Sequence, residues 1–406
     1  MRILHTADLH LGKRLGKATR LIEQCDVVKE IADIADEKDV DVILIAGDIF
    51  DAAVPPSEAE RVFYKSMLTF AERGRAVIAL AGNHDDEKRL CAAKPLADLQ
   101  GIVLAGELDY TAFSSEGFGD TIPPASLFEV ADAAEFLKKQ RVKLIGRYGG
   151  ITVVKGEERV NIALVPYPSE ARILRWATDR GIAPDYTKEF VDRVRTVIDE
   201  ACSIFDDNYN ILCTHLFLTK SNAEALGGLV ALPIDILPSK ADYVALGHVH
   251  KRYAVSKTPL AVYAGSPLQY AYDETRDKSV TVVDTVSRSV TPVPLTSGKK
   301  LTEAQAGSFD GCMQKLDFYS GDYVRLLYSG EPLAKDETAA IKAHPAFNDF
   351  VITASSTRAS KTISRANLSD DEIFNMYYKH RRGVEPSAEL KAAFKMLMER
   401  GNDETD

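Results

Sequence analysis

Cysteine is scarce in this sequence of 406 residues, and the five cysteines present are odd in number and widely spaced. A disulfide framework is therefore excluded as an organising feature, and we expect reduced thiols in a cytoplasmic protein. No apolar run of about 18 residues occurs, so no membrane-spanning helix is predicted. The chain enters directly into a strand-like segment, and we expect no signal peptide.

Positive charge is also in short supply. Lys and Arg number 50 against 60 Asp and Glu, which gives a formal net charge of −10. This balance argues against a protein that holds nucleic acid by bulk charge alone, although local basic patches or bound divalent ions could still hold phosphate. The length exceeds one typical domain and the 45% hydrophobic content is ample for packed cores, so two or three domains are expected.

What the sequence does contain is a set of five short apolar segments, each ending in side chains that bind metal ions. The segments are rich in Val, Ile, Leu and Ala, which is typical of buried strands. In layered α/β folds, ligands gather at the carboxyl ends of strands, so five distant pieces of sequence are expected to converge on one site. The segments span residues 3–10, 42–51, 77–85, 211–215 and 244–250.

The polar residues at these five ends form a mixed set of ligands. Two carboxylates, one amide and four imidazoles suit manganese, iron or zinc better than calcium or a thiolate zinc site. Seven ligands are too many for one ion and suit two divalent ions about 3.5–4 Å apart. We expect Asp48 to bridge them, because a carboxylate has two oxygens. The predicted ligands are Asp8, His10, Asp48, Asn83, His215, His248 and His250.

Three further polar residues lie beside these ligands. His84 follows Asn83 directly, and adjacent side chains point apart, so His84 is predicted to act as an acid or transition-state stabiliser rather than as a ligand. Asp85 is expected to hold His84 in position by a hydrogen bond. Asp51 could orient a histidine in the same way, or it could cap the helix that follows.

Basic residues follow three of the five ligand segments in pairs. Beside a metal site such pairs suggest contacts to a phosphate backbone, although each single pair is equally well explained as part of a solvated loop. Four aromatic and basic residues further along could likewise contact nucleic acid or belong to a plain hairpin loop. The pairs are Lys13 and Arg14, Lys88 and Arg89, and Lys251 and Arg252, and the later residues are Tyr270, Tyr272, Arg276 and Lys278.

Taken together, the five segments resemble the calcineurin-like metallophosphoesterase superfamily. They contain DLH at 8–10, GDIFD at 47–51, GNHD at 82–85, TH at 214–215 and GHVH at 247–250. A closer resemblance is to SbcD-type nuclease subunits, and it is carried by ILHTADLHLG, AGDIFDAAVPP, LAGNHD, ALGHVHK and YAGSP followed by DETRDKS. The resemblance implies a layered α/β fold of two packed mixed β-sheets flanked by helices, with a small α+β capping domain and C-terminal helices.

The character of the sequence changes after residue 284, where the metal motifs have ended. We predict a metallophosphoesterase domain over 1–284, and the resemblance implies a capping domain over 285–355 that helps to shape a DNA path. Residues 356–406 hold a polar linker and two short amphipathic helices, which could dock on their own domain. The resemblance implies instead that these helices bind the coiled coil of an SbcC-type ATPase, with apolar stripes entering a groove.

The function implied by the resemblance is that of a DNA nuclease with two divalent ions, manganese first among them. It would act with the ATPase in DNA repair and recombination, as a 3′–5′ exonuclease and an endonuclease on double-stranded or hairpin ends, and as a homodimer within a heterotetramer. An alternative is a metallophosphodiesterase for a nucleotide or another small phosphoester, which needs neither cap nor terminal helices. A non-catalytic scaffold predicts missing ligands, and all seven are present, so it ranks last.

Overall fold

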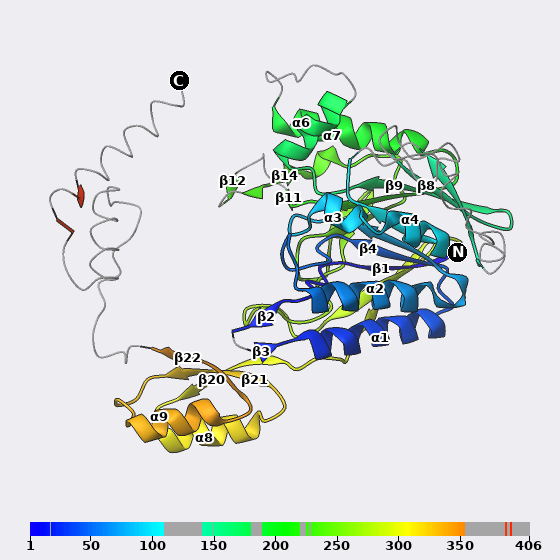
Figure 1. Cartoon of the computed structure of the whole chain (residues 1–406). Helices are drawn as coiled ribbons and strands as arrows, with labels where there is room; N and C mark the ends of the chain where they lie inside the picture. Colours follow the sequence, from blue (N-terminus) through cyan, green and yellow to red (C-terminus); the bar gives the residue numbers. More distant parts are fainter. Residues whose placement is uncertain are drawn as a thin grey trace. The chain divides into compact units, whose positions relative to one another are not determined.

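The computed structural model describes residues 1–16, 18–108, 140–147, 149–179, 189–219, 225–226, 229–353, 386–387 and 390–391 (Figure 1). The chain separates into two compact units, Met1–Ile352 and Thr353–Asp406, and the elements below belong to the first unit. The two predicted C-terminal helices lie outside the described residues. The predicted domain boundaries at residues 284 and 355 stay predictions.

Six strands form the first sheet, in the order β19-β18-β1-β4-β5-β6. Strands β1, β4, β5 and β6 are parallel neighbours, whereas β18 pairs antiparallel with β1 and with β19. Helical crossovers between the parallel strands bring their carboxyl ends to one edge of the sheet. The strands are β1 (Arg2–Thr6), β4 (Val42–Ala46), β5 (Ala76–Leu80), β6 (Ile102–Ala105), β18 (Ser279–Asp284) and β19 (Ser289–Pro294).

Seven strands form the second sheet, in the order β16-β17-β15-β10-β9-β8-β7. The four central strands β9, β10, β15 and β17 are parallel, and antiparallel strands complete both sides. The strands are β7 (Lys143–Arg147), β8 (Gly150–Lys155), β9 (Glu158–Val165), β10 (Tyr209–His215), β15 (Tyr243–Gly247), β16 (Tyr253–Lys257) and β17 (Leu260–Tyr263).

Alternate side chains of the central strands point to opposite faces of each sheet. In β1, Ile3 packs into the core between the two sheets, and Leu4 packs into the core beneath the helices. Ile211 and Leu212 divide in the same way in β10. Both faces of each sheet are thus buried, which explains why these strands are apolar almost throughout. The resulting helix–sheet–sheet–helix layers confirm the expected layered α/β fold (Figure 1).

Helices α1 and α2 cover the first sheet, and helices α6 and α7 cover the second (Figure 1). Helix α1 buries Val27, Ile31 and Ala35, which recur about once per turn and form its apolar stripe. The helices are α1 (Leu21–Glu37), α2 (Ser57–Ala71), α3 (Glu87–Cys91), α4 (Lys94–Ala97), α6 (Glu170–Asp179) and α7 (Phe190–Ala201), with the 3-10 helices η1 (Glu72–Gly74), η2 (Asp98–Gln100), η4 (Cys202–Ile204) and η5 (Ile234–Ile236).

A small module of three parallel strands and two helices follows β19, the last strand of the first sheet, in sequence. It has its own core, in which Leu316 of a helix packs with Leu326 of a strand. Because its parallel strands alternate with its helices, the module is α/β rather than the α+β fold expected for this part of the chain. Its elements are β20 (Leu301–Ala306), α8 (Phe309–Phe318), β21 (Tyr323–Tyr328), α9 (Lys335–Ala343) and β22 (Phe347–Ile352).

Three pairs of two-residue strands complete the described part of the chain. None of the helices within the described ranges combines the length and the apolarity needed to cross a bilayer. The short strands are β2 (Arg14–Leu15), β3 (Ala18–Thr19), β11 (Leu218–Thr219), β12 (Ala225–Leu226), β13 (Leu229–Val230) and β14 (Leu232–Pro233).

Candidate metal centre

The seven predicted ligands come together where strands of both sheets end. The first sheet contributes the residues that follow β1, β4 and β5, and the second sheet contributes the end of β10 and the residues that follow β15. Four of these side chains, those of Asp8, His10, Asp48 and His215, are buried. A buried carboxylate needs a compensating partner, so two of them at one place already point to a site for cations.

Four of the ligands have backbones in the left-handed region, which L residues rarely adopt. Such a conformation costs on the order of 1–3 kcal/mol and persists only where the surroundings enforce it. Here the amide of Asp8 donates to the Gly47 carbonyl at 3.0 Å, and the amide of His10 donates to the Asp48 carbonyl at 3.0 Å. The loops after β1 and β4 thereby hold each other. The four φ angles are 55° for Asp8, 43° for His10, 49° for Asp48 and 98° for His248.

Two glycines allow the edges of the two sheets to meet. A Cβ on Gly247, at the end of β15, would lie 1.8 Å from the carbonyl oxygen of Ala46 at the end of β4. A Cβ on Gly47 would lie 2.2 Å from Nδ1 of His215. Both separations are far inside van der Waals contact, so any other residue would force the edges apart. The glycines therefore set the distance between the carboxylates of one sheet and the imidazoles of the other.

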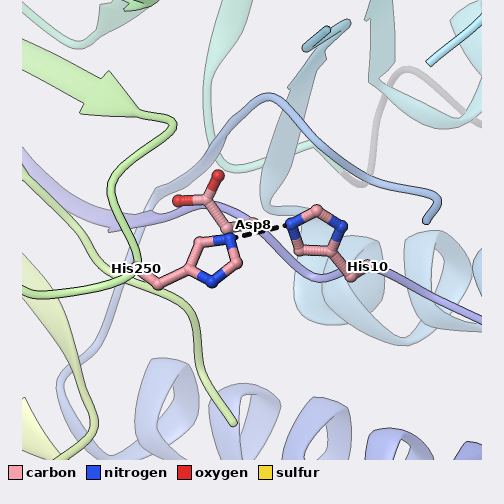
Figure 2. Close-up of side chains that lie close together, drawn as sticks. All are labelled: Asp8, His10 and His250. Atoms are coloured by element: carbon pink, nitrogen blue, oxygen red, sulfur yellow. Dashed lines mark hydrogen bonds between the residues drawn. The ribbon is translucent and has the colours of Figure 1, made fainter. Parts of the chain in front are cut away.

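Asp8, His10 and His250 form the first donor cluster (Figure 2). The Nε2 atoms of His10 and His250 face each other at 3.0 Å. One oxygen of Asp8 accepts the backbone amide of His248 at 2.9 Å, and the other oxygen is buried without a hydrogen-bond partner. Two ring nitrogens and one unpartnered carboxylate oxygen converge on one point, and a cation there would satisfy all three.

Asn83, His215 and His248 form the second donor cluster. The side-chain oxygen of Asn83 lies 3.0 Å from Nε2 of His215 and 3.0 Å from Nδ1 of His248. Nδ1 of His215 donates to the Ala46 carbonyl at 2.8 Å. Because that contact fixes the proton on Nδ1, Nε2 of His215 is free to offer its lone pair to an ion.

Asp48 lies between the two clusters. Its Oδ2 is 3.6 Å from Nε2 of His10 and 3.4 Å from Nε2 of His215. Its Oδ1 accepts the backbone amide of His84 at 2.9 Å, which fixes the plane of the carboxylate. A single oxygen within reach of one histidine from each cluster is the arrangement expected of a bridging ligand.

Burial and neighbouring charges both shift the pKa values of the side chains in the centre. Burial works against protonation of His215, but the adjacent Asp48 carboxylate outweighs it and raises the pKa of His215 to about 9. Burial also opposes ionisation of Asp48, yet the histidines around it hold its pKa well below the usual range. Burial dominates for Asp8, whose pKa is raised, and for His248, whose pKa falls to about 4. Protonation of His215 and binding of a cation at its Nε2 would therefore exclude each other.

The residues present fit two divalent ions. The donors are carboxylate, amide and neutral imidazole, the mixture preferred by manganese, iron and zinc. Three groups of side chains each bring their donor atoms within 4.8 Å of one another, and Asp48 belongs to two of them. The groups are Asp8, His10 and His250, then Asp8, Asp48 and His215, and then His10, Asp48 and His84, the last of which is predicted to be an acid rather than a ligand. The unpartnered oxygen of Asp8 and the facing ring nitrogens of His10 and His250 could all be ligands of one ion.

His84 lies beside the ligands, and Asp51 supports it. Nδ1 of His84 donates to the carbonyl of Asp51 at 2.8 Å, which leaves Nε2 for other contacts. The carboxylate of Asp51 lies 3.3 Å from Nδ1 of His10 and 2.7 Å from the ammonium of Lys13. Of the two roles considered for Asp51, these contacts favour the orientation of a histidine, since helix α2 is instead preceded by Pro56.

The hydrogen-bond partners of Asp85 differ from the one expected. Its carboxylate accepts the backbone amides of Ile49 at 3.0 Å, Phe50 at 2.8 Å and Gly82 at 2.8 Å. The expected hydrogen bond to His84 is replaced by that residue's contact with Asp51. Asp85 therefore ties the loop after β4 to the loop after β5, and it acts on the backbone that carries the ligands rather than on the His84 ring.

The six basic residues predicted as DNA contacts differ in their surroundings. Lys13 pairs with Asp51 as described above, Arg89 pairs with Glu60 at 2.8 Å, and Arg252 is partly buried with its Nε 3.0 Å from Thr281 Oγ1. The remaining three side chains, those of Arg14, Lys88 and Lys251, are exposed beside ligand loops.

Sequence analysis did not predict a role for Glu274, and the structure corrects two of the suggested nucleic-acid contacts. Glu274 accepts a hydrogen bond from Nδ1 of His250 at 2.8 Å, but it lies in a polar loop that offers no periodic signal. Lys278 is buried and paired with Glu274 at 2.7 Å, and Tyr270 is buried with its hydroxyl on the Leu9 carbonyl. Neither Lys278 nor Tyr270 is available to a nucleic acid.

Tyr167 and Arg172 were also missed. The ring of Tyr167 stacks beside that of His248, with centroids 6.4 Å apart and planes at 17°. Arg172 of α6 donates to the carbonyls of Gly82 at 3.1 Å and Asp85 at 2.7 Å, so it holds the loop that carries the amide ligand. Tyr167 follows the end of the buried strand β9, which is the same signal that identified the ligands.

Comparison with known proteins agrees with this geometry. The family model for calcineurin-like phosphoesterases matches residues 1–252, a range that includes all seven ligand positions. The chain belongs to the calcineurin-like phosphoesterase family, and it is a metal-dependent hydrolase of phosphodiesters.

Similar curated relatives are named as the SbcD subunit of the nuclease SbcCD, which places the chain in the SbcD-type branch of the family. The relative from Bacillus subtilis is 34% identical over 321 residues, which cover 76% of this chain and 73% of that protein. The relative from Escherichia coli K12 is 26% identical, and the match covers 68% of this chain and 62% of that protein. The relative from Staphylococcus saprophyticus is 21% identical over 99% of this chain and all of that protein.

Proposed function

We propose that the chain is a two-metal DNA nuclease, with 3′–5′ exonuclease and endonuclease activity on double-stranded or hairpin ends. The observation that carries the proposal is the position of Asp48, one oxygen of which lies within 3.6 Å of a histidine from each donor cluster. A carboxylate oxygen shared between two ions suits the short separation of the ions in two-metal hydrolysis of a phosphodiester. The names of the relatives, all nuclease subunits, support DNA as the substrate.

The chemistry divides between the ions and the protein. Two bound divalent ions would lower the pKa of a water molecule and neutralise charge on the phosphate. In this mechanism Asp8, Asp48 and Asn83 supply oxygen ligands, and the histidines supply neutral nitrogen ligands. The described loops around the ligands keep these donors in place before substrate arrives, so little reorganisation is needed during the reaction.

His84 is proposed to protonate the leaving oxygen. Its Nδ1 donates to the Asp51 carbonyl at 2.8 Å, so the proton given to the leaving oxygen would come from Nε2. A water molecule loses one proton to solvent and its oxygen bonds to phosphorus, the bond from phosphorus to the leaving oxygen breaks, and that oxygen takes the Nε2 proton. His84 then regains a proton from solvent. A general acid of this kind contributes about 10²–10⁴-fold in rate. No covalent intermediate with the enzyme is required.

The path of the DNA is proposed to follow the exposed basic residues. Arg14 of β2, Lys88 of α3 and Lys251 each follow a different ligand loop, and contacts from several places would fix the register of a phosphate backbone. The capping module over 285–355 is proposed to border this path. The negative net charge of the chain makes such local contacts necessary, because bulk attraction would be absent.

The assembly proposed is a homodimer within a heterotetramer, with Mn²⁺ as the metal and the cytoplasm as the location. The partner is an SbcC-type coiled-coil ATPase, bound by the helices predicted over 356–406, and the context is DNA repair and recombination. The printed names of the relatives support this partner, since each is named as one subunit of the nuclease SbcCD. The alternative, a phosphodiesterase for a nucleotide or small phosphoester, uses the same centre and needs no partner.

The test is degradation of linear duplex DNA with Mn²⁺ by the full chain, alone and with the partner ATPase. The variant His84→Ala should lose about 10²–10⁴-fold in rate while it retains both ions. His344→Ala is a matched control, because that histidine lies in the capping module and contacts Asp317. DNA left intact with the ATPase present, together with cleavage of bis-p-nitrophenyl phosphate, would instead support the small-phosphoester alternative.

A further inference from the structure

The His250 ring is held from behind by a carboxylate. Its Nε2 faces His10 in the first donor cluster (Figure 2), and its Nδ1 lies 2.8 Å from Oε1 of Glu274. A carboxylate can only accept a hydrogen bond, so the proton of the neutral ring must be on Nδ1. This tautomer leaves the Nε2 lone pair directed at the place where an ion would bind.

Glu274 is itself fixed by a buried lysine. Its Oε2 accepts from Nζ of Lys278 at 2.7 Å, and the two side chains are only 12% and 7% exposed. Nζ of Lys278 also donates to the carbonyl of His250 at 3.1 Å and to Oγ of Ser266 at 2.8 Å. The lysine therefore holds both the backbone of the histidine and the carboxylate behind its ring.

The same loop is tied to the capping module. The carboxamide of Gln269 donates to the carbonyl of Glu274 at 3.1 Å and accepts the amide of Leu301, the first residue of β20, at 2.9 Å. Arg276 reaches Oγ1 of Thr302 on the same strand at 3.1 Å. The position of Glu274 thus depends on contacts with both the metal centre and the cap.

An equivalent arrangement stands on the opposite side of the first donor cluster. There the carboxylate of Asp51 lies behind the His10 ring, and Lys13 pairs with Asp51. Two facing imidazoles are each backed by a carboxylate and a lysine. The Asp51 and Lys13 side chains are 31% and 27% exposed, so water can replace part of their contacts. The side chains of Glu274 and Lys278 are too buried for water to replace their contacts in this way.

We propose that Glu274 is a positioning residue that fixes the tautomer and orientation of His250 for metal binding, and that Lys278 holds Glu274 in place. The proposal rests on the proposed two-metal centre and adds a residue that determines the metal affinity of its first donor cluster. Carboxylates behind ligating histidines typically contribute about 10–100-fold to metal affinity.

The experiment measures Mn²⁺ binding to the metal-stripped full chain by calorimetry, without DNA. The key variant is the double substitution Glu274→Met with Lys278→Met, because a buried ion pair replaced by apolar residues of similar volume usually leaves the fold intact. We expect one of the two dissociation constants to rise about 10–100-fold. Glu274→Gln, whose amide oxygen can still accept from His250, should lose much less. Asp273→Asn, an exposed neighbour on the same loop, should match wild type.

Nitrogen NMR of ¹⁵N-labelled histidine separates positioning from mere stabilisation. Wild type and Glu274→Gln should show His250 protonated on Nδ1, and the double variant should show a mixture of tautomers. A double variant that folds and binds both ions with wild-type affinity, or that keeps the single tautomer, would overturn the proposal. The outcome is independent of DNA cleavage, so a failure of the nuclease assay would not affect it.

Discussion

The two sheets contribute different chemistry to the metal centre. The first sheet supplies the carboxylates Asp8 and Asp48 and the amide Asn83, together with His10. The second sheet supplies only imidazoles. The carboxylates of the first sheet would repel each other without cations or protonated histidines between them. The centre therefore exists only when both sheet edges meet, and metal binding is coupled to the packing of the sheets.

The hydrogen bonds that orient the ligands also differ between the two sheets. On the first sheet, backbone amides orient the carboxylates, as His84 does for Asp48 and as His248 does for Asp8. On the second sheet, acceptors hold the rear nitrogens of the imidazoles, namely the Ala46 carbonyl for His215 and Glu274 for His250. Donors orient oxygen ligands and acceptors orient nitrogen ligands, and each contact leaves the opposite atom directed at the ions.

Separating the two edges should have the largest effect. In Gly247→Ala the new methyl group would overlap the Ala46 carbonyl, 1.8 Å away, and backbone cannot yield as a flexible side chain does. Overpacking of this severity should lower the free energy of unfolding by about 3 kcal/mol or more. Denaturant unfolding followed by circular dichroism measures the loss, and metal analysis should show that both ions are lost with it.

The control for this substitution is Gly321→Ala. A methyl group there would meet nothing within 4 Å, so stability and metal content should be close to wild type. If Gly247→Ala were as stable as this control and retained both ions, the two edges would not be in the close contact described.

The charge difference between the edges should appear in the pH dependence of metal binding. In the metal-free protein Asp48 raises the pKa of His215 to about 9, so a proton occupies His215 at neutral pH and must leave when its Nε2 binds an ion. Mn²⁺ affinity should therefore rise about tenfold per unit between about pH 6.5 and pH 8.5. Calorimetry in buffers of different ionisation enthalpy should detect the released proton. An affinity that is flat across this range would contradict the coupling.

A smaller effect, on thermal stability, is expected at Asp98, a carboxylate that lies outside the metal centre. Like Asp8, Asp98 of η2 has a buried oxygen without a hydrogen-bond partner, and burial raises its pKa to about 6. A raised carboxyl pKa means that ionisation destabilises the fold as pH increases from about 4 to about 6. Asp98→Asn should therefore raise Tm by roughly 1–2 °C at pH 8 and leave it unchanged at pH 4. Calorimetric scans at both pH values decide, and a lower Tm at pH 8 would refute it.

Sequence analysis could find residues that follow buried strands. The apolar runs before Asp8, Asp48 and His215 are local signals, and parallel strands carry their ends to a common edge, so the convergence of distant ligands could be predicted. The layered fold followed from the same pattern of apolar segments, but the parallel α/β arrangement of the small module did not. The roles of the individual ligands and of His84 remain predictions that the geometry supports.

Contacts between one loop and another have no comparable local signal in the sequence. Glu274 lies in a polar stretch, and only the folded chain brings it to His250. Asp85 could not be assigned correctly, because its partners are backbone amides of the preceding ligand loop, contributed by Ile49 and Phe50. Lys278 was predicted to contact nucleic acid or to belong to a plain hairpin loop, whereas the folded chain buries it beside Glu274. Such pairings depend on tertiary structure, which periodicity along the chain does not encode.

The most direct test of the central claim is anomalous scattering from crystals of the full chain grown with Mn²⁺. The two edges should hold two peaks about 3.5–4 Å apart, with Asp48 in contact with both. One peak should be ligated by the first donor cluster and the other by the second. A single peak, or two peaks that share no ligand, would contradict the account of a centre assembled from the two sheets around one bridging carboxylate.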